Sequence, residues 1–189
     1  MATHLTVKEK EGQAYEKMKG VFLYKNAMAG PRVKKIVINT GTGTAIKKDK
    51  NKNEAIVDRL AKISGQKAVL RGAKQSIASF KVRQGDPIGV VVTLRGKRMY
   101  AFLDKLINVA IPRTKDFRGI NRSAIDNIGN LTIGIKEHTI FPETADEDIR
   151  DVFGMSITLV CTAKNKKEGI AFFELLGIPF SAQGGSASG

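Results

Sequence analysis

The sequence predicts an α+β fold, in which an antiparallel sheet has helices packed on one face and its other face open. Several segments alternate apolar and polar residues with a period of two, which is typical of strands that are buried on one side only. Other segments carry apolar residues at helical spacing. These helical segments are too dispersed along the chain for a helical bundle, so we expect them to cover the sheet.

The first helix is expected over residues 5–24, and Gly30-Pro31 breaks the chain after it. A strand is expected next, over residues 33–40. Its period of two places Ile36 and Ile38 together on the face that packs into the core. The opposite, more polar face then carries Lys35, Val37 and Asn39.

The second helix is expected to begin at Asn51, because Glu54 follows at the spacing of a capping box, and to end at Gly65. Its buried stripe consists of Ile56, Leu60 and Ile63. A short strand is predicted over residues 67–71. The polar and basic residues 73–86 that follow predict either a long loop or a protruding hairpin.

The clearest strand covers residues 89–95, and the clearest helix covers residues 97–110 and ends at Pro112. One face of the strand carries Val90, Val92 and Leu94, and the other carries Val91, Thr93 and Arg95. The apolar stripe of the helix consists of Met99, Phe102, Leu103, Leu106, Ile107 and Ala110.

The C-terminal part predicts a loop over residues 114–130 and two further strands, over 131–135 and 155–161. A last helix is expected after Asn165, with Glu168 completing a second capping signature. Its core residues are expected to be Ile170, Phe173 and Leu176.

We expect one domain over residues 1–180, the N-terminal helix included, and a flexible tail of Ser, Gly and Ala over residues 181–189. No apolar run is long enough to cross a membrane, and the N-terminus does not resemble a secretory signal. A chain with one cysteine cannot form an internal disulfide, which fits a reducing compartment.

Positive charge is concentrated in one stretch of the chain. The net charge is +14, and residues 31–100 contain 17 Lys and Arg against four Asp and Glu. The first 30 residues carry +2 and the last 89 carry −1. Concentrated positive charge favours a polyanionic partner, because each phosphate that Lys or Arg neutralises releases a counterion.

The nucleophilic and metal-binding side chains give no support to catalysis. His4 and His138 are the only histidines, and neither has a partner at metal-ligand spacing. We expect His138 to be a surface or partly buried loop residue and Cys161 to be a small core residue. The acidic residues at 143–148 predict a solvated helix start rather than a cation site. We therefore expect neither enzymatic activity, nor a cofactor, nor a metal.

The Gly41-Thr42-Gly43 turn has three interpretations. A dinucleotide-binding enzyme would need a third glycine leading directly into a helix, but Ile46 stands at that position and the basic residues 47–50 follow. We favour a flexible basic turn. The third interpretation is that the two glycines let the backbone approach an RNA strand closely.

Folded RNA is the polyanion that we expect this chain to bind. Residues 31–100 contain only two aromatic residues, Phe80 and Tyr100, whereas single-strand binders stack bases on exposed aromatics. Recognition is expected through phosphates, 2′-hydroxyls and shape, on the open face of the sheet. A general polyanion or acidic-membrane binder is the competing interpretation. The cations concerned are Lys47, Lys48, Lys50, Lys52, Lys67, Arg71, Lys74, Lys81, Arg83, Arg95, Lys97 and Arg98.

A series of short motifs, in one order from about residue 30 to residue 180, resembles the large-subunit ribosomal protein L five family of bacteria. They include Ile38-Asn39-Thr40-Gly41, Ile63-Ser64-Gly65-Gln66-Lys67, residues 79–89, Val92-Thr93-Leu94-Arg95-Gly96, residues 111–119, Ile140-Phe141-Pro142-Glu143 and Thr162-Ala163-Lys164. So many motifs in order make the resemblance specific.

The resemblance implies a structural, non-catalytic component of the ribosome, in the cytoplasm or in an organelle of bacterial descent. That family binds 5S rRNA in the central protuberance of the large subunit, next to 23S-type rRNA and neighbouring large-subunit proteins. Its RNA contacts include an Asn, a Gln and a Thr that match Asn39, Gln66 and Thr93 here. The cations expected to accompany them are Lys35, Lys67, Arg71 and Arg95.

The resemblance also implies that the basic loop at residues 73–86 reaches toward P-site tRNA, and that other loops join a bridge to a protein of the small-subunit head. The loop residues expected to face tRNA are Lys74, Phe80, Lys81 and Arg83. Asp86 stands where the family often has an aromatic residue, and His138 stands where it usually has Gln. No cofactor, small-molecule substrate or membrane is implied.

Overall fold

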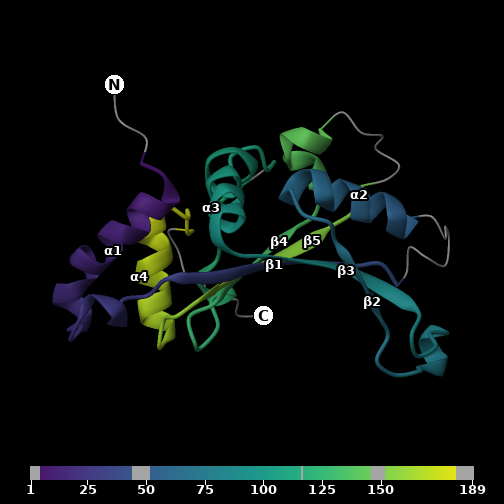
Figure 1. The fold of residues 1–189 in the computed structure, drawn as a ribbon, viewed down its shortest axis with the longest axis horizontal. Helices are drawn as coiled ribbons and strands as arrows, with labels where there is room; N and C mark the ends of the chain where they lie inside the picture. Colours follow the sequence, from purple (N-terminus) through teal and green to yellow (C-terminus); the bar gives the residue numbers. More distant parts are fainter. Residues whose placement is uncertain (1–4, 44–51, 116, 146–151, 182–189) are drawn as a thin grey trace. The chain divides into compact units, whose positions relative to one another are not determined.

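The computed structural model describes residues 5–43, 52–115, 117–145 and 152–181. Within these residues the fold is α+β, as predicted, with an antiparallel sheet in the order β2-β3-β1-β5-β4 (Figure 1). The strands are β1 (Val33–Gly41), β2 (Val69–Gly72), β3 (Pro87–Leu94), β4 (Leu131–Ile135) and β5 (Met155–Cys161). The helices are α1 (Val7–Phe22), α2 (Lys52–Ser64), α3 (Gly96–Lys105) and α4 (Lys166–Leu176).

The chain divides into two compact units, and β1, β4 and β5 contribute residues to both. Unit 1 comprises Met1–Ile36, Arg95–Ile133 and Thr158–Gly189, and unit 2 comprises Val37–Leu94 and Gly134–Ile157. One domain over residues 1–180 stays a prediction. The expected tail lies outside the described residues from 182 onward.

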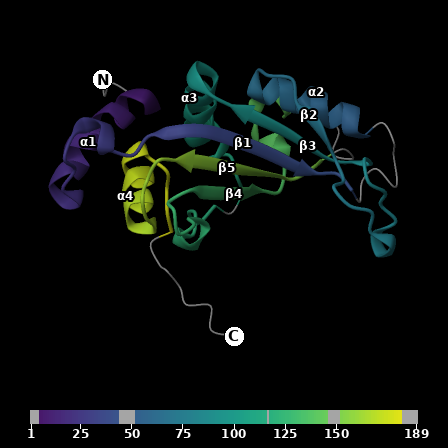
Figure 2. The ribbon, with the colours of Figure 1, turned by 60° about the horizontal axis from the view of Figure 1, so that its bottom comes forward.

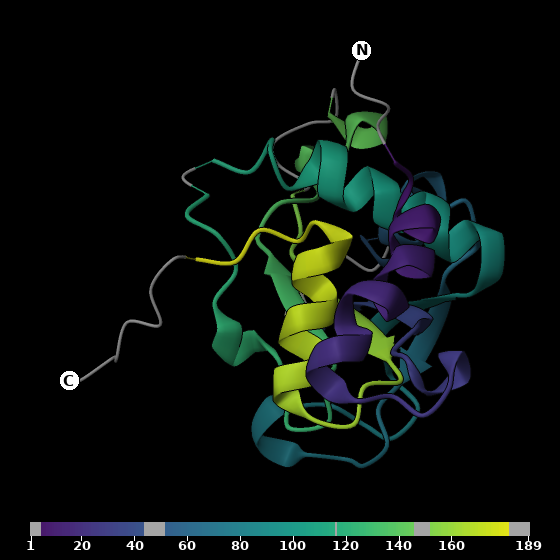
Figure 3. The ribbon, with the colours of Figure 1, turned by 90° about the vertical axis from the view of Figure 1, so that its left-hand side faces the viewer.

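Unit 1 contains α1, α3 and α4. Helix α1 begins where the Thr6 hydroxyl accepts a hydrogen bond from the Glu9 N–H and the Glu9 carboxylate accepts one from the Thr6 N–H, a complete capping box. Figure 3 shows α1 and α4 side by side, and α1 also packs against α3. Apolar side chains of all three helices are buried: Val7, Ala14, Met18, Met99, Phe102, Leu103, Phe172, Phe173 and Leu176.

The start of α4 differs in part from its prediction. Asn165 caps the helix by accepting from the Glu168 N–H at 2.9 Å, as expected. Glu168 is 2% exposed. Its carboxylate does not complete a capping box with the Asn165 N–H but accepts from the Tyr24 hydroxyl at 2.6 Å and from the Lys164 N–H at 2.7 Å. Burial and this carboxylate raise the pKa of Tyr24. Ile170 is only half-buried, because the stripe that faces the core runs through Phe172 instead.

A close approach of two glycines also holds unit 1 together. A Cβ on Gly169 would come within 2.7 Å of the Cα and carbonyl oxygen of Gly129. We expect Gly169→Ala to lower the free energy of unfolding by about 1–3 kcal/mol through overpacking. Gly12→Ala in α1 is the control, because a Cβ there meets nothing within 4 Å, and it should stabilise by roughly 0.5–1 kcal/mol. Denaturant unfolding curves that rank the two substitutions equally would contradict the packing assignment.

Unit 2 contains α2 and the whole of β2 and β3. Its predicted buried residues are confirmed on the helix, at Ile56, Leu60 and Ile63, and on β3, at Val90, Val92 and Leu94. Val91 and Thr93 alternate with them and are half-exposed. Figure 2 shows α2 on one side of β2 and β3, and on the other side the described residues of this unit have no α-helix, only the short 3₁₀ turn η2 (Ala78–Phe80) at the hairpin tip. The sheet face of unit 2 opposite α2 is therefore open.

Several element boundaries differ from their predictions. β2 begins at Val69 rather than at residue 67, and β3 ends at Leu94, so Arg95 does not belong to the strand but precedes α3 as its extended N-cap residue. The last turn before Pro112 is π-helical, over Leu106–Ala110, and the Ile111 N–H donates to the Leu106 carbonyl at 2.9 Å.

The prediction for His138 was wrong, because this side chain is fully buried in unit 2. Its ring stacks on Phe153 with 4.2 Å between ring centroids, and its Nδ1 accepts from the Phe153 N–H at 3.4 Å. An imidazole can enter a core because its faces are apolar and its nitrogens can be satisfied by backbone groups. Polarity alone therefore misplaced this residue on the surface.

Candidate nucleic-acid interface

Asn39 lies on the open face of unit 2. Its position in β1 alternates with the buried Ile38 and Thr40, so its side chain is exposed. Its backbone carbonyl accepts from the Ser156 hydroxyl of β5 at 3.3 Å. Among the described residues the Asn39 carboxamide has no hydrogen-bond partner, so both its donor and its acceptor are available to a ligand.

Gln66 and Thr93 lie next to each other in unit 2. The Gln66 Nε2 donates to the Thr93 carbonyl at 3.2 Å, and the Gln66 N–H donates to the Ser64 hydroxyl at 3.3 Å. Both residues are half-exposed. These bonds leave the Gln66 carboxamide oxygen and the Thr93 hydroxyl without a partner in the described part of the chain. The structure thus brings together two of the three polar residues that the sequence singled out.

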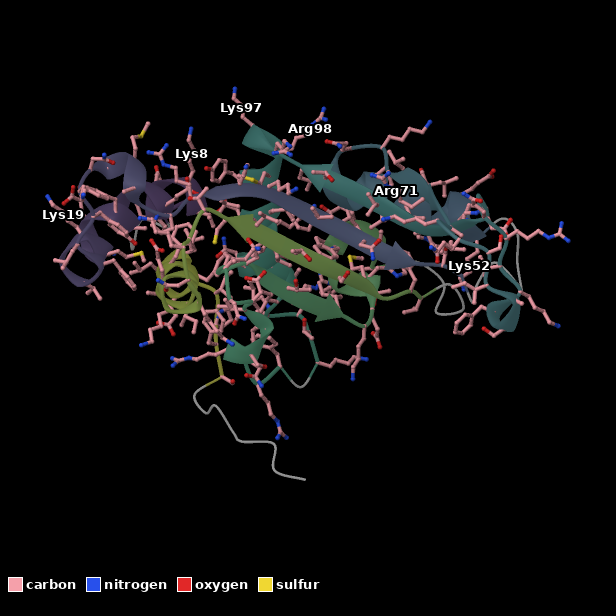
Figure 4. The ribbon with its side chains drawn as sticks, turned by 90° about the horizontal axis from the view of Figure 1, so that it is seen from below. Lys8, Lys19, Lys52, Arg71, Lys97 and Arg98 are labelled. Atoms are coloured by element: carbon pink, nitrogen blue, oxygen red, sulfur yellow. The ribbon has the colours of Figure 1, made fainter. Side chains whose placement is uncertain are left out.

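Arg71 lies on the open face of unit 2. Residues directly opposite each other in paired strands share a face of the sheet, and Arg71 pairs with Gly89 while Val69 pairs with Val91. Both partners alternate on β3 with the buried Val90, so Arg71 faces away from the core. Arg71 and Lys67 are exposed, and neither forms an ion pair within the residues that the structure describes. Lys62 on α2, by contrast, pairs with Asp58 at 3.1 Å. Figure 4 views the molecule from below, where the strands of unit 2 lie in front of α2 and Arg71 is labelled.

Residues 73–86 form the tip of a protruding hairpin between β2 and β3, one of the two predicted alternatives. The Ala73 N–H donates to the Asp86 carbonyl at 2.8 Å, and Ile77 pairs with Val82. The Asp86 carboxylate accepts from the Arg83 N–H at 2.7 Å, so this residue closes the turn. The tip exposes the residues expected to face tRNA: Lys74, Phe80, Lys81 and Arg83.

A groove of about 920 Å³ lies in unit 2 beside the hairpin tip. Asn39 and Arg71 line it together with other residues of β1, β2 and β3 and with residues of the tip. The sequence reasoning missed this groove. The Gly41-Thr42-Gly43 turn was the part of the sequence that indicated the groove. Both glycines line the groove, where larger side chains would fill it.

Further predicted cations belong to unit 1. Lys35 is half-buried in β1, and Arg95 is exposed before α3. Lys97 and Arg98 extend from the start of α3 away from the ribbon (Figure 4). Lys47, Lys48 and Lys50 lie outside the described residues. None of Lys35, Arg95, Lys97 and Arg98 forms an ion pair within the described part of the chain.

The described residues contain neither a reactive cysteine nor a metal site. Burial raises the pKa of the Cys161 thiol, which donates to the Gly129 carbonyl at 3.0 Å, so this residue is a core side chain as predicted. No group of acidic, His and Cys side chains in the described ranges could hold a metal ion.

The Thr42 N–H donates to the Ile88 carbonyl at 2.8 Å and connects the glycine turn to β3. No helix in the described residues is long and apolar enough to span a membrane.

Comparison with known families identifies the chain. The family model described as ribosomal protein L5 matches residues 26–83, and the model for the C-terminus of the ribosomal L5P family matches residues 87–180. Together these matches cover most of the chain and make it a ribosomal protein. It belongs to the ribosomal protein L5 family, as the motifs indicated.

Close relatives support the same assignment. A large ribosomal subunit protein uL5 of Trichlorobacter lovleyi is 49% identical over 90% of this chain and 94% of its own length. That of Desulfatibacillum aliphaticivorans is 53% identical over 87% of this chain and 91% of its own length. That of Mycoplasma mycoides subsp. mycoides is 47% identical over 95% of this chain and 99% of its own length.

Proposed function

We propose that this protein is a structural constituent of the large ribosomal subunit that binds 5S rRNA through the open face of unit 2. The observation that carries the proposal is the uncommitted polar chemistry of that face. Asn39, Gln66 and Thr93 all belong to unit 2 and retain free donors or acceptors, and the exposed cations Lys67 and Arg71 belong to the same unit. Hydrogen bonds would fix the register on the RNA, and the cations would neutralise its phosphates.

The remaining contacts in the proposal follow from the hairpin tip and from unit 1. Lys74, Lys81 and Arg83 at the tip contact P-site tRNA, and Phe80 provides an apolar surface among them. The cations of unit 1, Lys35 and Arg95 among them, contact rRNA of the 5S or 23S type. Other loops meet neighbouring large-subunit proteins and a protein of the small-subunit head. The protein acts in the cytoplasm, bound to the ribosome, and has no catalytic role.

Removing one polar side chain from the open face should weaken 5S rRNA binding. Asn39→Ala and Thr93→Ala are each expected to cost about 1–3 kcal/mol, because a buried polar group of the RNA loses its partner. A filter-binding titration with 5S rRNA measures the loss. Asn127→Ala is the control, since that exposed asparagine lies in a loop of unit 1 outside the predicted site.

The same titration separates the proposal from a general polyanion binder. A specific binder retains 5S rRNA in the presence of heparin, and the two alanine substitutions lower its affinity for 5S rRNA more than its affinity for heparin. Equal losses for both ligands, or unchanged 5S rRNA affinity in both variants, would contradict the assignment.

A further inference from the structure

The groove in unit 2 has the size and lining of a small-ligand site. Its volume of about 920 Å³ lies within the roughly 300–1,000 Å³ of pockets that hold small organic molecules. Backbone lines it at Gly41 and Gly89, where no side chain limits access. Ile77 and Phe80 line it from the hairpin, and they are 46% and 63% exposed. An apolar, partly aromatic surface thus lies beside bare strand backbone.

The polar groups of this groove match the parts of a nucleotide. The Asn39 carboxamide offers a donor and an acceptor side by side, the pattern that pairs with a base edge. Arg71 and Lys74 also line the groove and form no ion pair among the described residues, so they can bind a phosphate. The exposed ring of Phe80 can stack on a base.

We propose that this groove binds one unstacked nucleotide of an RNA, and the inference rests on the proposed function. The base lies against Ile77 and Phe80, and its edge bonds to Asn39. Arg71 and Lys74 hold the adjoining phosphate. A nucleotide within a helix cannot bind in this way, because its faces are covered by neighbouring bases and its edge is paired. The RNA therefore presents a bulged, looped or extruded position here.

Gly41→Val fills the groove while sparing the fold. A Cβ at Gly41 meets nothing within 4 Å, and a β-branched residue suits a strand. Gly134→Val in β4 is the matched control, because a Cβ there also meets nothing within 4 Å and Gly134 does not line the groove. Phe80→Ala removes the stacking surface by a second route, at an exposed position.

The experiment uses the full chain with two RNAs, 5S rRNA and deacylated tRNA. Affinities are measured by filter binding, and base-specific chemical probes map which base edges each complex protects. We expect wild-type protein to protect an unpaired base that becomes reactive in the Gly41→Val complex. Gly41→Val and Phe80→Ala should each lower the affinity about 5- to 100-fold, the cost of one lost base-stacking contact. Gly134→Val should leave that base protected, as in the wild-type complex.

The two RNAs distinguish the source of the nucleotide. Loss of protection on 5S rRNA alone or on tRNA alone supports the groove and names that RNA. Gly41→Val and Phe80→Ala complexes that keep wild-type affinity and protection on both RNAs would overturn it, and so would a wild-type complex in which no base is protected. Failure of the proposed function looks different: wild-type protein then does not bind 5S rRNA, and the tRNA titration alone decides the groove.

Discussion

Raising the salt concentration from 50 to 200 mM should weaken binding to 5S rRNA by about 10³-fold if the complex neutralises about six phosphates. Each phosphate contact releases condensed counterions, so log K falls by roughly 0.7–0.9 per contact for each tenfold increase in salt. The charge distribution of this chain supports a steep slope, because residues 31–100 carry 17 cations against four acids. Filter-binding titrations at several salt concentrations measure it. A flat response would remove the electrostatic basis of the proposed function.

A matched pair of lysines in unit 2 tests which cations contribute to this slope. Lys67 is exposed and forms no ion pair among the described residues, whereas Lys62 pairs with Asp58 at 3.1 Å. We expect Lys67→Gln to reduce the salt slope by about 1 and Lys62→Gln to leave it nearly unchanged. Equal slopes for the two variants would mean that Lys67 does not contact a phosphate.

The strands and helices of this fold could be predicted because burial imposes a period on the sequence. In β5, Met155, Ile157 and Leu159 alternate with half-exposed residues over the predicted range. The predicted ends of helices and strands were less accurate where local backbone hydrogen bonding, rather than a change in the apolar pattern, ends the element. The transition at Arg95 and the π-helical turn before Pro112 depend on backbone geometry that an apolar stripe does not encode.

The candidate site could be predicted only in part. The period of β1 and β3 placed Asn39 and Thr93 on the less buried face, where the structure has them. Gln66 follows α2 in a loop, where no periodic pattern of the sequence predicts the direction of a side chain. Its bond to the Thr93 carbonyl follows only from the three-dimensional fold. The groove joins residues from three strands and a hairpin tip, a juxtaposition that only the fold creates. His138 shows the converse error, since its burial depends on Phe153, fifteen residues away.

Phe172→Ala should lower the free energy of unfolding by about 3–5 kcal/mol, because it removes a large buried side chain and leaves a cavity. Phe172 is 0% exposed, and its ring centroid lies 5.6 Å from that of Phe173 in the helix that packs against α1. The surrounding helices can collapse only partly into the space, so lost contacts add to the lost transfer free energy.

The stability of Phe172→Ala is compared with that of Phe80→Ala by denaturant unfolding. Both substitutions delete the same atoms, but Phe80 is 63% exposed at the hairpin tip, so its loss should change stability by less than about 0.5 kcal/mol. Phe80→Ala should therefore lose RNA affinity without losing the fold, and Phe172→Ala should lose stability first. A similar midpoint for both variants would mean that α4 does not depend on Phe172 for its packing.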